Sequence, residues 1–123
     1  MPGRILVIRG GALGDFILTL PAIRLLRDNF RDGALHILGY RHIAILAEGY
    51  YADSIRSIDY GPLAGFFNPK ASLDGELCDY FAGFRQIVSY IYDPDGLFEG
   101  GLRRAGAREG ARGQRRAPRA APR

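Results

Sequence analysis

The chain has 123 residues, which is enough for one domain with its own hydrophobic core. Its formal charge of +4 is divided unevenly. Residues 1–101 hold 9 Lys and Arg against 12 Asp and Glu, a net charge of −3, whereas residues 102–123 hold 8 Arg and one Glu, a net charge of +7. The basic balance therefore does not indicate a nucleic-acid-binding surface on the folded part. The single cysteine, Cys78, excludes an internal disulfide.

The first 39 residues predict a strand, a glycine loop, a helix and a second strand. Residues 5–8 form a short continuous apolar run, which is typical of a strand buried on both faces of a parallel sheet. A helix is expected from about Asp15 to Asn29, and its apolar residues that can pack on the sheet include Phe16, Leu20, Ile23 and Leu26. Three polar residues, three and four apart, predict a solvent-facing stripe on this helix: Arg24, Arg27 and Asp28.

The later segments continue the alternation of strands and helices. The pattern predicts strands over 34–39, 54–60 and 86–92, helices over 41–48 and 73–81, a loop over 61–73 and a turn over 93–96. Strands that alternate with helices form right-handed βαβ units. We therefore expect an α/β fold: a Rossmann-like parallel sheet with helices on both faces, spanning residues 1–101.

Residues 102–123 differ in composition from the rest of the chain. They are almost wholly Arg, Ala, Gly and Pro, with Leu102 as the single large apolar residue. Such a segment buries too little surface to offset its ordering entropy, so we expect a disordered basic tail that contributes nothing to folding. Two interpretations stay open: a basic arm for nucleic acid or acidic lipid, or GC-rich coding DNA read in a shifted frame.

The loop between the first strand and the first helix is the sharpest motif. In open α/β sheets ligands bind at the carboxyl ends of the strands, and the loop offers Gly10, Gly11 and Gly14 beside the cation Arg9. Glycines allow close backbone approach, and free amide groups at a helix start favour an anion. A dinucleotide fingerprint would need glycine in place of Arg9, and a P-loop would need Lys and Ser or Thr after Gly14. Both alternatives are therefore disfavoured.

Asp15 follows this loop, and its position permits two roles. A carboxylate at a helix N-terminus can act as a cap, worth about 1 kcal/mol. At the ligand-binding edge of a sheet, it can also act as a general base that takes a proton from an acceptor hydroxyl. The two roles do not exclude one another.

Residues 4–26 resemble the opening of the ADP-heptose:lipopolysaccharide heptosyltransferases, glycosyltransferase family 9. The shared features are a strand, a Gly-x-x-Gly-Asp loop at 11–15 and a helix carrying Thr19-Leu20-Pro21-Ala22. The resemblance extends over about residues 4–101 and is closest over 4–30. It implies a GT-B fold with two Rossmann-like domains, in which the N-terminal domain faces the acceptor and the C-terminal domain holds the sugar nucleotide. It also implies that Asp15 is the catalytic base.

Four further residues are candidates for the acceptor cleft. Asp93 and Asp95 follow the strand predicted over 86–92, and Arg41 and His42 follow the second strand. The alternatives are an ordinary turn for the two aspartates and a solvated helix start for Arg41 and His42. No His, Asp and Glu cluster has metal-ligand spacing, so no metal and no cofactor is expected.

The expected function is therefore transfer of heptose, or a similar sugar, from a nucleotide-sugar such as ADP-heptose to a lipid-linked saccharide of the lipopolysaccharide type. Because the donor-binding half lies outside this chain, we expect no activity from the chain alone. The alternatives are a truncated, non-enzymatic fragment and a nucleotide-binding oxidoreductase domain. The expected location is the cytoplasm, because no signal peptide precedes the first strand, with peripheral contact at the inner-membrane surface.

Overall fold

The computed structural model describes residues 3–48, 51–59, 61–106 and 110–112. These residues form one five-stranded sheet in the order β3–β2–β1–β4–β5, in which every pairing is parallel. The elements in chain order are β1 (Arg4–Arg9), α1 (Leu13–Asn29), β2 (Ala34–Gly39), α2 (Arg41–Ala44), the 3₁₀-helix η1 (Ile45–Ala47), β3 (Ser54–Ser57), the 3₁₀-helix η2 (Gly61–Phe67), α3 (Gly75–Ala82), β4 (Gln86–Ser89), α4 (Leu97–Arg104) and β5 (Gly110–Arg112).

The first strand lies at the centre of the sheet. Val7 of β1 pairs with Ile37 of β2 on one side and with Val88 of β4 on the other. The strand is buried over residues 5–8, as its continuous apolar run predicts. The predicted parallel α/β architecture is confirmed, although the segment predicted as a loop over 61–73 begins with η2.

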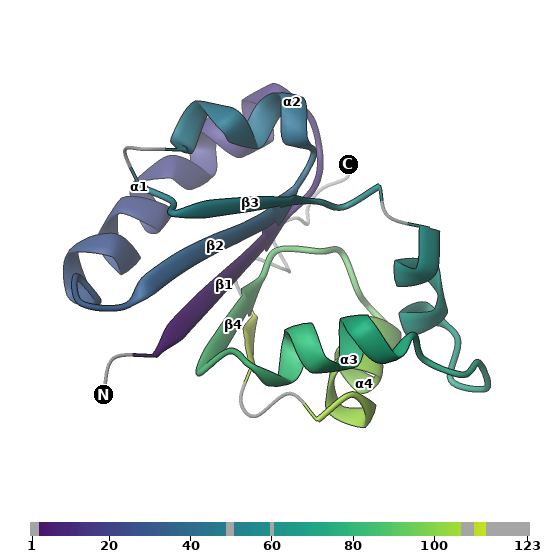
Figure 1. Ribbon diagram of the computed structural model, residues 1–123. Helices are drawn as coiled ribbons and strands as arrows, with labels where there is room; N and C mark the ends of the chain where they lie inside the picture. Colours follow the sequence, from purple (N-terminus) through teal and green to yellow (C-terminus); the bar gives the residue numbers. More distant parts are fainter. Residues whose placement is uncertain (1–2, 49–50, 60, 107–109, 113–123) are drawn as a thin grey trace.

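Helices cover both faces of the sheet (Figure 1). The side chains of β1 alternate between two cores, so Ile5 and Val7 face α1, α2 and η1, while Leu6 and Ile8 face α3, α4 and η2. The second core is rich in aromatic rings, and its buried phenylalanines are Phe66, Phe81, Phe84 and Phe98.

The helix α1 packs as predicted, with one correction. Phe16 and Ile23 are buried against the sheet, but Arg27 does not belong to a solvent stripe. Its guanidinium donates to the Asp53 carboxylate at 2.7 Å and to the carbonyl groups of Arg31 and Gly33 at 3.0 and 2.6 Å. The reason is that the turn after α1 leaves carbonyl groups without backbone donors, and a cation near the helix C-terminus satisfies them.

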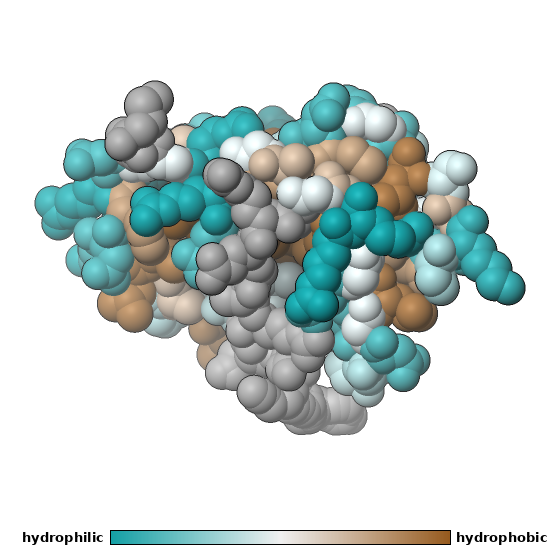
Figure 2. All heavy atoms as spheres, turned by 90° about the horizontal axis from the view of Figure 1, so that it is seen from below, coloured by the Kyte–Doolittle hydropathy of each residue, from teal (hydrophilic) through white to brown (hydrophobic). Residues whose placement is uncertain are grey.

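Large apolar side chains also reach the surface. Leu13, Ile17, Leu18 and Leu25 of α1 stay 48 to 79% exposed. On the face of the molecule shown in Figure 2, hydrophobic atoms reach the surface on both sides of the grey residues, among hydrophilic side chains. The outer side of α1 is therefore mixed, because these apolar side chains share it with the exposed ion pair of Arg24 and Asp28.

The predicted boundary between residues 101 and 102 is corrected by α4, which continues to Arg104. Leu102 is only 6% exposed because it lies one helical turn after the buried Phe98. The Arg104 guanidinium donates to the carbonyl groups of Ala71 and Asn68 at 3.2 and 3.0 Å, and residues 110–112 pair with β4. The remainder of the predicted tail, residues 107–109 and 113–123, lies outside the described residues.

The environment of His36 in β2 indicates that the stability of the fold depends on pH. Its ring meets the Phe84 ring edge-on at 5.2 Å. Burial, and then the charge of Arg4, hold the pKa of His36 below its usual 6.5, against the opposing effect of Asp53. The unfolded state therefore binds a proton on His36 more readily than the folded state does. The stability that neutral His36 contributes is present above about pH 6.5, and it is lost as the pH falls from there through the folded-state pKa.

We therefore expect the free energy of unfolding to fall between about pH 7.5 and pH 5, and His36→Gln to flatten that decline. Urea unfolding of both proteins at the two pH values measures the effect. Equal declines in wild type and variant would show that His36 titrates alike in the folded and unfolded states.

Candidate functional site at the carboxyl end of the central strand

The loop from β1 to α1 is shaped by Gly11 and Asp15. Gly11 has a φ of 86°, and Ala12 in extended conformation is the N-cap residue of α1. The helix begins at Leu13, two residues earlier than predicted, so Asp15 is its third residue and not its cap. From there the Asp15 Oδ2 accepts a hydrogen bond from the Ala12 amide at 3.2 Å. The carboxylate thus reaches back over the loop.

The three glycines of the loop differ in whether the structure could accept a side chain at their positions. At Gly11 a side chain would need a strained backbone, and its Cβ would lie 2.8 Å from the Asp15 Oδ2. At Gly10 a Cβ would make ordinary contacts with Ile58 and Tyr40, and at Gly14 it would meet open space. Only Gly11 is therefore required by the fold of the loop.

This difference gives a matched pair of substitutions. We expect Gly11→Ala to lower the free energy of unfolding by about 1 to 3 kcal/mol, because alanine is strained at positive φ. We expect Gly14→Ala, in the first turn of α1, to leave stability unchanged or to raise it by up to about 1 kcal/mol. Chemical denaturation measures both. A harmless Gly11→Ala would mean that the loop adopts another conformation.

Arg9 forms one wall of the site beside Asp15. Its NH2 group donates to the Asp15 carbonyl oxygen at 3.2 Å and lies 3.9 Å from the Asp15 Oδ1. The Arg9 side chain is 21% exposed and that of Asp15 is 55% exposed. The Arg9 Nε is buried and has no hydrogen-bond partner among the described residues. The carboxylate is thus held beside a cation while one side of it stays open to solvent.

Tyr90, the first residue after β4, packs its ring against the Arg9 guanidinium. The Arg9 guanidinium carbon lies 5.4 Å from the centroid of the Tyr90 ring. Burial raises the pKa of Tyr90, against the opposing charge of Arg9, so the phenol is neutral at physiological pH. The sequence analysis missed Tyr90, because it placed this residue inside a strand predicted over 86–92, whereas β4 ends at Ser89.

Arg41 and His42 lie at the same edge, in the first turn of α2 after β2. Both side chains are exposed, and the His42 ring lies 6.2 Å from that of Tyr40. Among the described residues no hydrogen bond or ion pair joins them to Asp15. The topology brings them to one edge, because β2 and β1 are neighbouring parallel strands, but it does not bring them into contact.

The two aspartates after β4 differ from one another. The Asp93 carboxylate accepts hydrogen bonds from the Phe98 and Glu99 amides at 3.0 and 2.9 Å, so it is engaged in holding the start of α4. Asp95 is exposed, and no hydrogen bond or ion pair involves its carboxylate in the part of the chain that the structure describes. Of the two, only Asp95 is available to a ligand.

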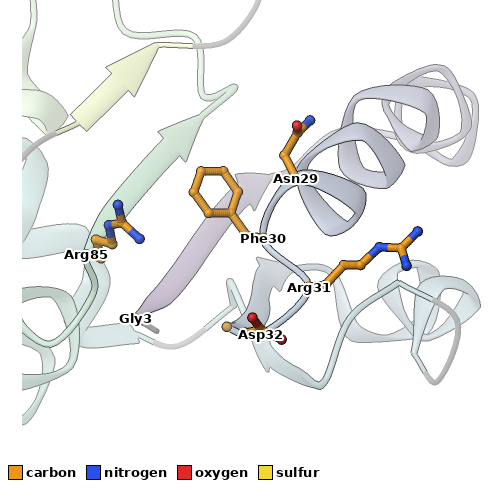
Figure 3. Close-up of a pocket in the computed structure, with 7 residues that line it drawn as sticks. Gly3, Asn29, Phe30, Arg31, Asp32 and Arg85 are labelled. Carbon is orange, nitrogen blue, oxygen red and sulfur yellow. The ribbon is translucent and has the colours of Figure 1, made fainter. Parts of the chain in front are cut away.

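A cavity of about 340 Å³ lies at the opposite, amino end of the sheet. Its lining consists of Gly3, residues 29–33 and Arg85. Figure 3 shows the Arg85 side chain reaching toward the Phe30 ring, whereas the Arg31 side chain points away from both. The Arg85 guanidinium carbon is 5.6 Å from the Phe30 ring centroid. The cavity is therefore separate from the edge that carries Asp15.

Two further properties of the described residues bear on function. No group of three or more His, Cys, Asp or Glu side chains among them is placed to hold a metal ion. None of the helices in the described ranges combines the length and the apolar character that a bilayer crossing needs.

The fold has a counterpart among solved structures. Neither a protein-family model nor a curated protein matches the chain. The chain is similar to a solved structure described as "The crystal structure of the glycosyl transferase family 9 from Veillonella parvula DSM 2008", with 15% sequence identity and a TM-score of 0.62. The similarity covers 94% of this chain and 34% of that one. The fold is that of one Rossmann-like half of a GT-B structure. The chain spans about a third of the length of that glycosyltransferase.

Proposed function

We propose that this chain is the acceptor-binding part of a family 9 glycosyltransferase. The proposed reaction transfers heptose, or a similar sugar, from a nucleotide-sugar to a lipid-linked saccharide of the lipopolysaccharide type. The observation that carries the proposal is the place of Asp15. It lies after a glycine loop at the carboxyl end of the central strand, in a fold also found in a family 9 glycosyltransferase.

In the proposed mechanism the acceptor hydroxyl attacks the anomeric carbon of the donor sugar, and the bond to the nucleoside diphosphate breaks. Asp15 takes the proton of the attacking hydroxyl. The Arg9 guanidinium donates to the Asp15 carbonyl oxygen at 3.2 Å and lies 3.9 Å from the Asp15 carboxylate, so the carboxylate has a cation on one side. The amide groups at the start of α1, with Arg41 nearby at the same edge, favour an anionic group such as a phosphate on the acceptor.

The proposal assigns the nucleotide-sugar to a second Rossmann-like half, because GT-B enzymes bind donor and acceptor on opposite sides of a cleft. The acceptor's lipid would bring the protein to the cytoplasmic surface of the inner membrane. No nucleic acid takes part, since the described sheet edge carries carboxylates as well as cations.

The experiment joins this chain to the donor-binding half of a family 9 glycosyltransferase and measures sugar transfer from ADP-heptose to a lipopolysaccharide-type acceptor. We expect turnover from the joined protein and none from the 123-residue chain alone. Turnover by the isolated chain would contradict the division of labour between two halves. A joined protein that binds the donor but transfers nothing would contradict the proposed acceptor role.

A further inference from the structure

The Arg9 side chain is held beside Asp15 by weak polar contacts. Its guanidinium donates to the Asp15 carbonyl oxygen at 3.2 Å, and its ion pair with the Asp15 carboxylate is long, at 3.9 Å. The Arg9 Nε is buried and has no hydrogen-bond partner in the part of the chain that the structure describes. Arginine has many rotamers, and fixing one of them costs conformational entropy. These polar contacts alone therefore do not account for the fixed position of the guanidinium.

A further interaction of this guanidinium is with the ring of Tyr90. The Arg9 guanidinium carbon lies 5.4 Å from the ring centroid, within the range of a cation–π interaction. This interaction strengthens where water is excluded, and the Arg9 side chain is only 21% exposed. The ring is therefore the contact that burial strengthens, whereas the ion pair is long and half open to solvent.

Tyr90 is itself anchored on the sheet. It directly follows β4, which pairs with β1 so that Ser89 lies opposite Ile8. The Tyr90 amide donates to the Ile8 carbonyl at 2.8 Å, which continues the strand pairing and brings Tyr90 beside Arg9. Tyr90 also packs against the core on the α1 face of the sheet. Its ring is therefore a fixed support between that core and Arg9.

We propose that Tyr90 is a positioning residue, whose aromatic ring holds the Arg9 guanidinium beside the Asp15 carboxylate. Without the ring, water reaches the Arg9 Nε, and the guanidinium is free to leave Asp15 for solvent. The ring and not the hydroxyl has this role, because the contact with Arg9 is made by the ring. The inference rests on the proposed function, since Asp15 is the proposed base, and Tyr90 acts on it only through Arg9.

Exchange of the Arg9 Nε–H proton with water, measured by ¹H–¹⁵N NMR on the full chain, tests this contact. The absence of the signal in Arg9→Lys assigns it. We expect exchange to be at least about tenfold faster in Tyr90→Leu than in wild type, because the Nε–H becomes hydrated. Tyr90→Phe keeps the ring and should exchange at the wild-type rate.

Tyr51→Leu is the matched control for a general loss of packing. Tyr51 packs against the same core, but Arg27 and not Arg9 lies beside it. Exchange of the Arg9 Nε–H in this variant should therefore equal that of wild type. Tyr90 is only partly buried, so we expect its variants to fold, which circular dichroism checks. Tyr90→Met, which also lacks a ring, replaces Tyr90→Leu if the latter is unfolded.

Sugar transfer by the protein that joins this chain to a donor-binding half gives the functional measurement. We expect Tyr90→Leu to lower kcat at least about fivefold and to leave KM for the nucleotide-sugar unchanged, because a displaced Arg9 disturbs the base and not the donor-binding half. Tyr90→Phe should keep kcat within about twofold of wild type.

Three results would overturn the positioning role and leave the proposed function standing. Equal Arg9 exchange in wild type and Tyr90→Leu would show that the ring does not hold the guanidinium. A Tyr90→Phe variant that behaves like Tyr90→Leu would assign the effect to the hydroxyl. Faster exchange with an unchanged kcat would show that the position of Arg9 does not affect the reaction. Absence of transfer by the wild-type joined protein would instead reject the proposed function, and the positioning role with it.

Discussion

In the protein that joins this chain to a donor-binding half, we expect Asp15→Asn to lower kcat by at least about 100-fold. That factor corresponds to about 2.7 kcal/mol of barrier. The amide oxygen of asparagine can still accept the Ala12 hydrogen bond that Asp15 accepts at 3.2 Å, so the start of α1 is kept. What the variant loses is the group that takes the proton from the attacking hydroxyl. Steady-state kinetics measures the effect.

The free energy of unfolding distinguishes a catalytic role of Asp15 from a purely structural one. Asp15 is 55% exposed and its distance to Arg9 is 3.9 Å, so we expect the free energy of unfolding to change by less than about 1 kcal/mol. Asp28→Asn, on the exposed side of the same helix, is the matched control and should leave kcat unchanged. A near-normal kcat in Asp15→Asn would restrict Asp15 to its structural role and leave the proton to another acceptor.

The second large effect concerns the end of the folded domain. We expect Leu102→Ala to lower the free energy of unfolding by about 2 kcal/mol or more, because it removes a side chain buried to all but 6% in the aromatic core. For a domain of this size that loss lowers Tm by about 8 °C or more. Thermal unfolding followed by circular dichroism measures it.

Leu97→Ala provides the comparison within the same helix. Leu97 is 41% exposed, so the same substitution there should cost less than about 1 kcal/mol. If both variants unfold at the wild-type temperature, Leu102 lies outside the core and the folded domain ends before it.

The sheet and most of its helices could be predicted from the sequence because their signals are local. Residues 5–8 have the uninterrupted apolar run of a strand covered on both faces, and β1 is indeed central. The end of the domain could not be predicted in this way. Leu102 is one apolar residue in a segment rich in Arg and Ala, and its burial depends on Phe98 and the aromatic core, which lie together only in the folded chain.

The candidate site was predictable in position but not in its contacts. The glycine loop and Asp15 follow directly from the strand–loop–helix pattern. The capping geometry did not, because a helix that begins at Leu13 behind an alanine N-cap has no sequence signal at its first residue. Similarly, Arg27 has the spacing of a surface residue, yet it bonds to a turn whose carbonyl groups are oriented by the tertiary fold.

The most direct test of the central claim is to map where an acceptor binds on this chain. Amide chemical-shift perturbation with a deacylated lipopolysaccharide core saccharide makes that measurement on the isolated protein. Binding at the carboxyl end of the sheet predicts perturbed amides in residues 9–15, 39–42 and 90–97. Perturbations centred instead on the cavity at the amino end, around Phe30 and Arg85, would contradict the claim.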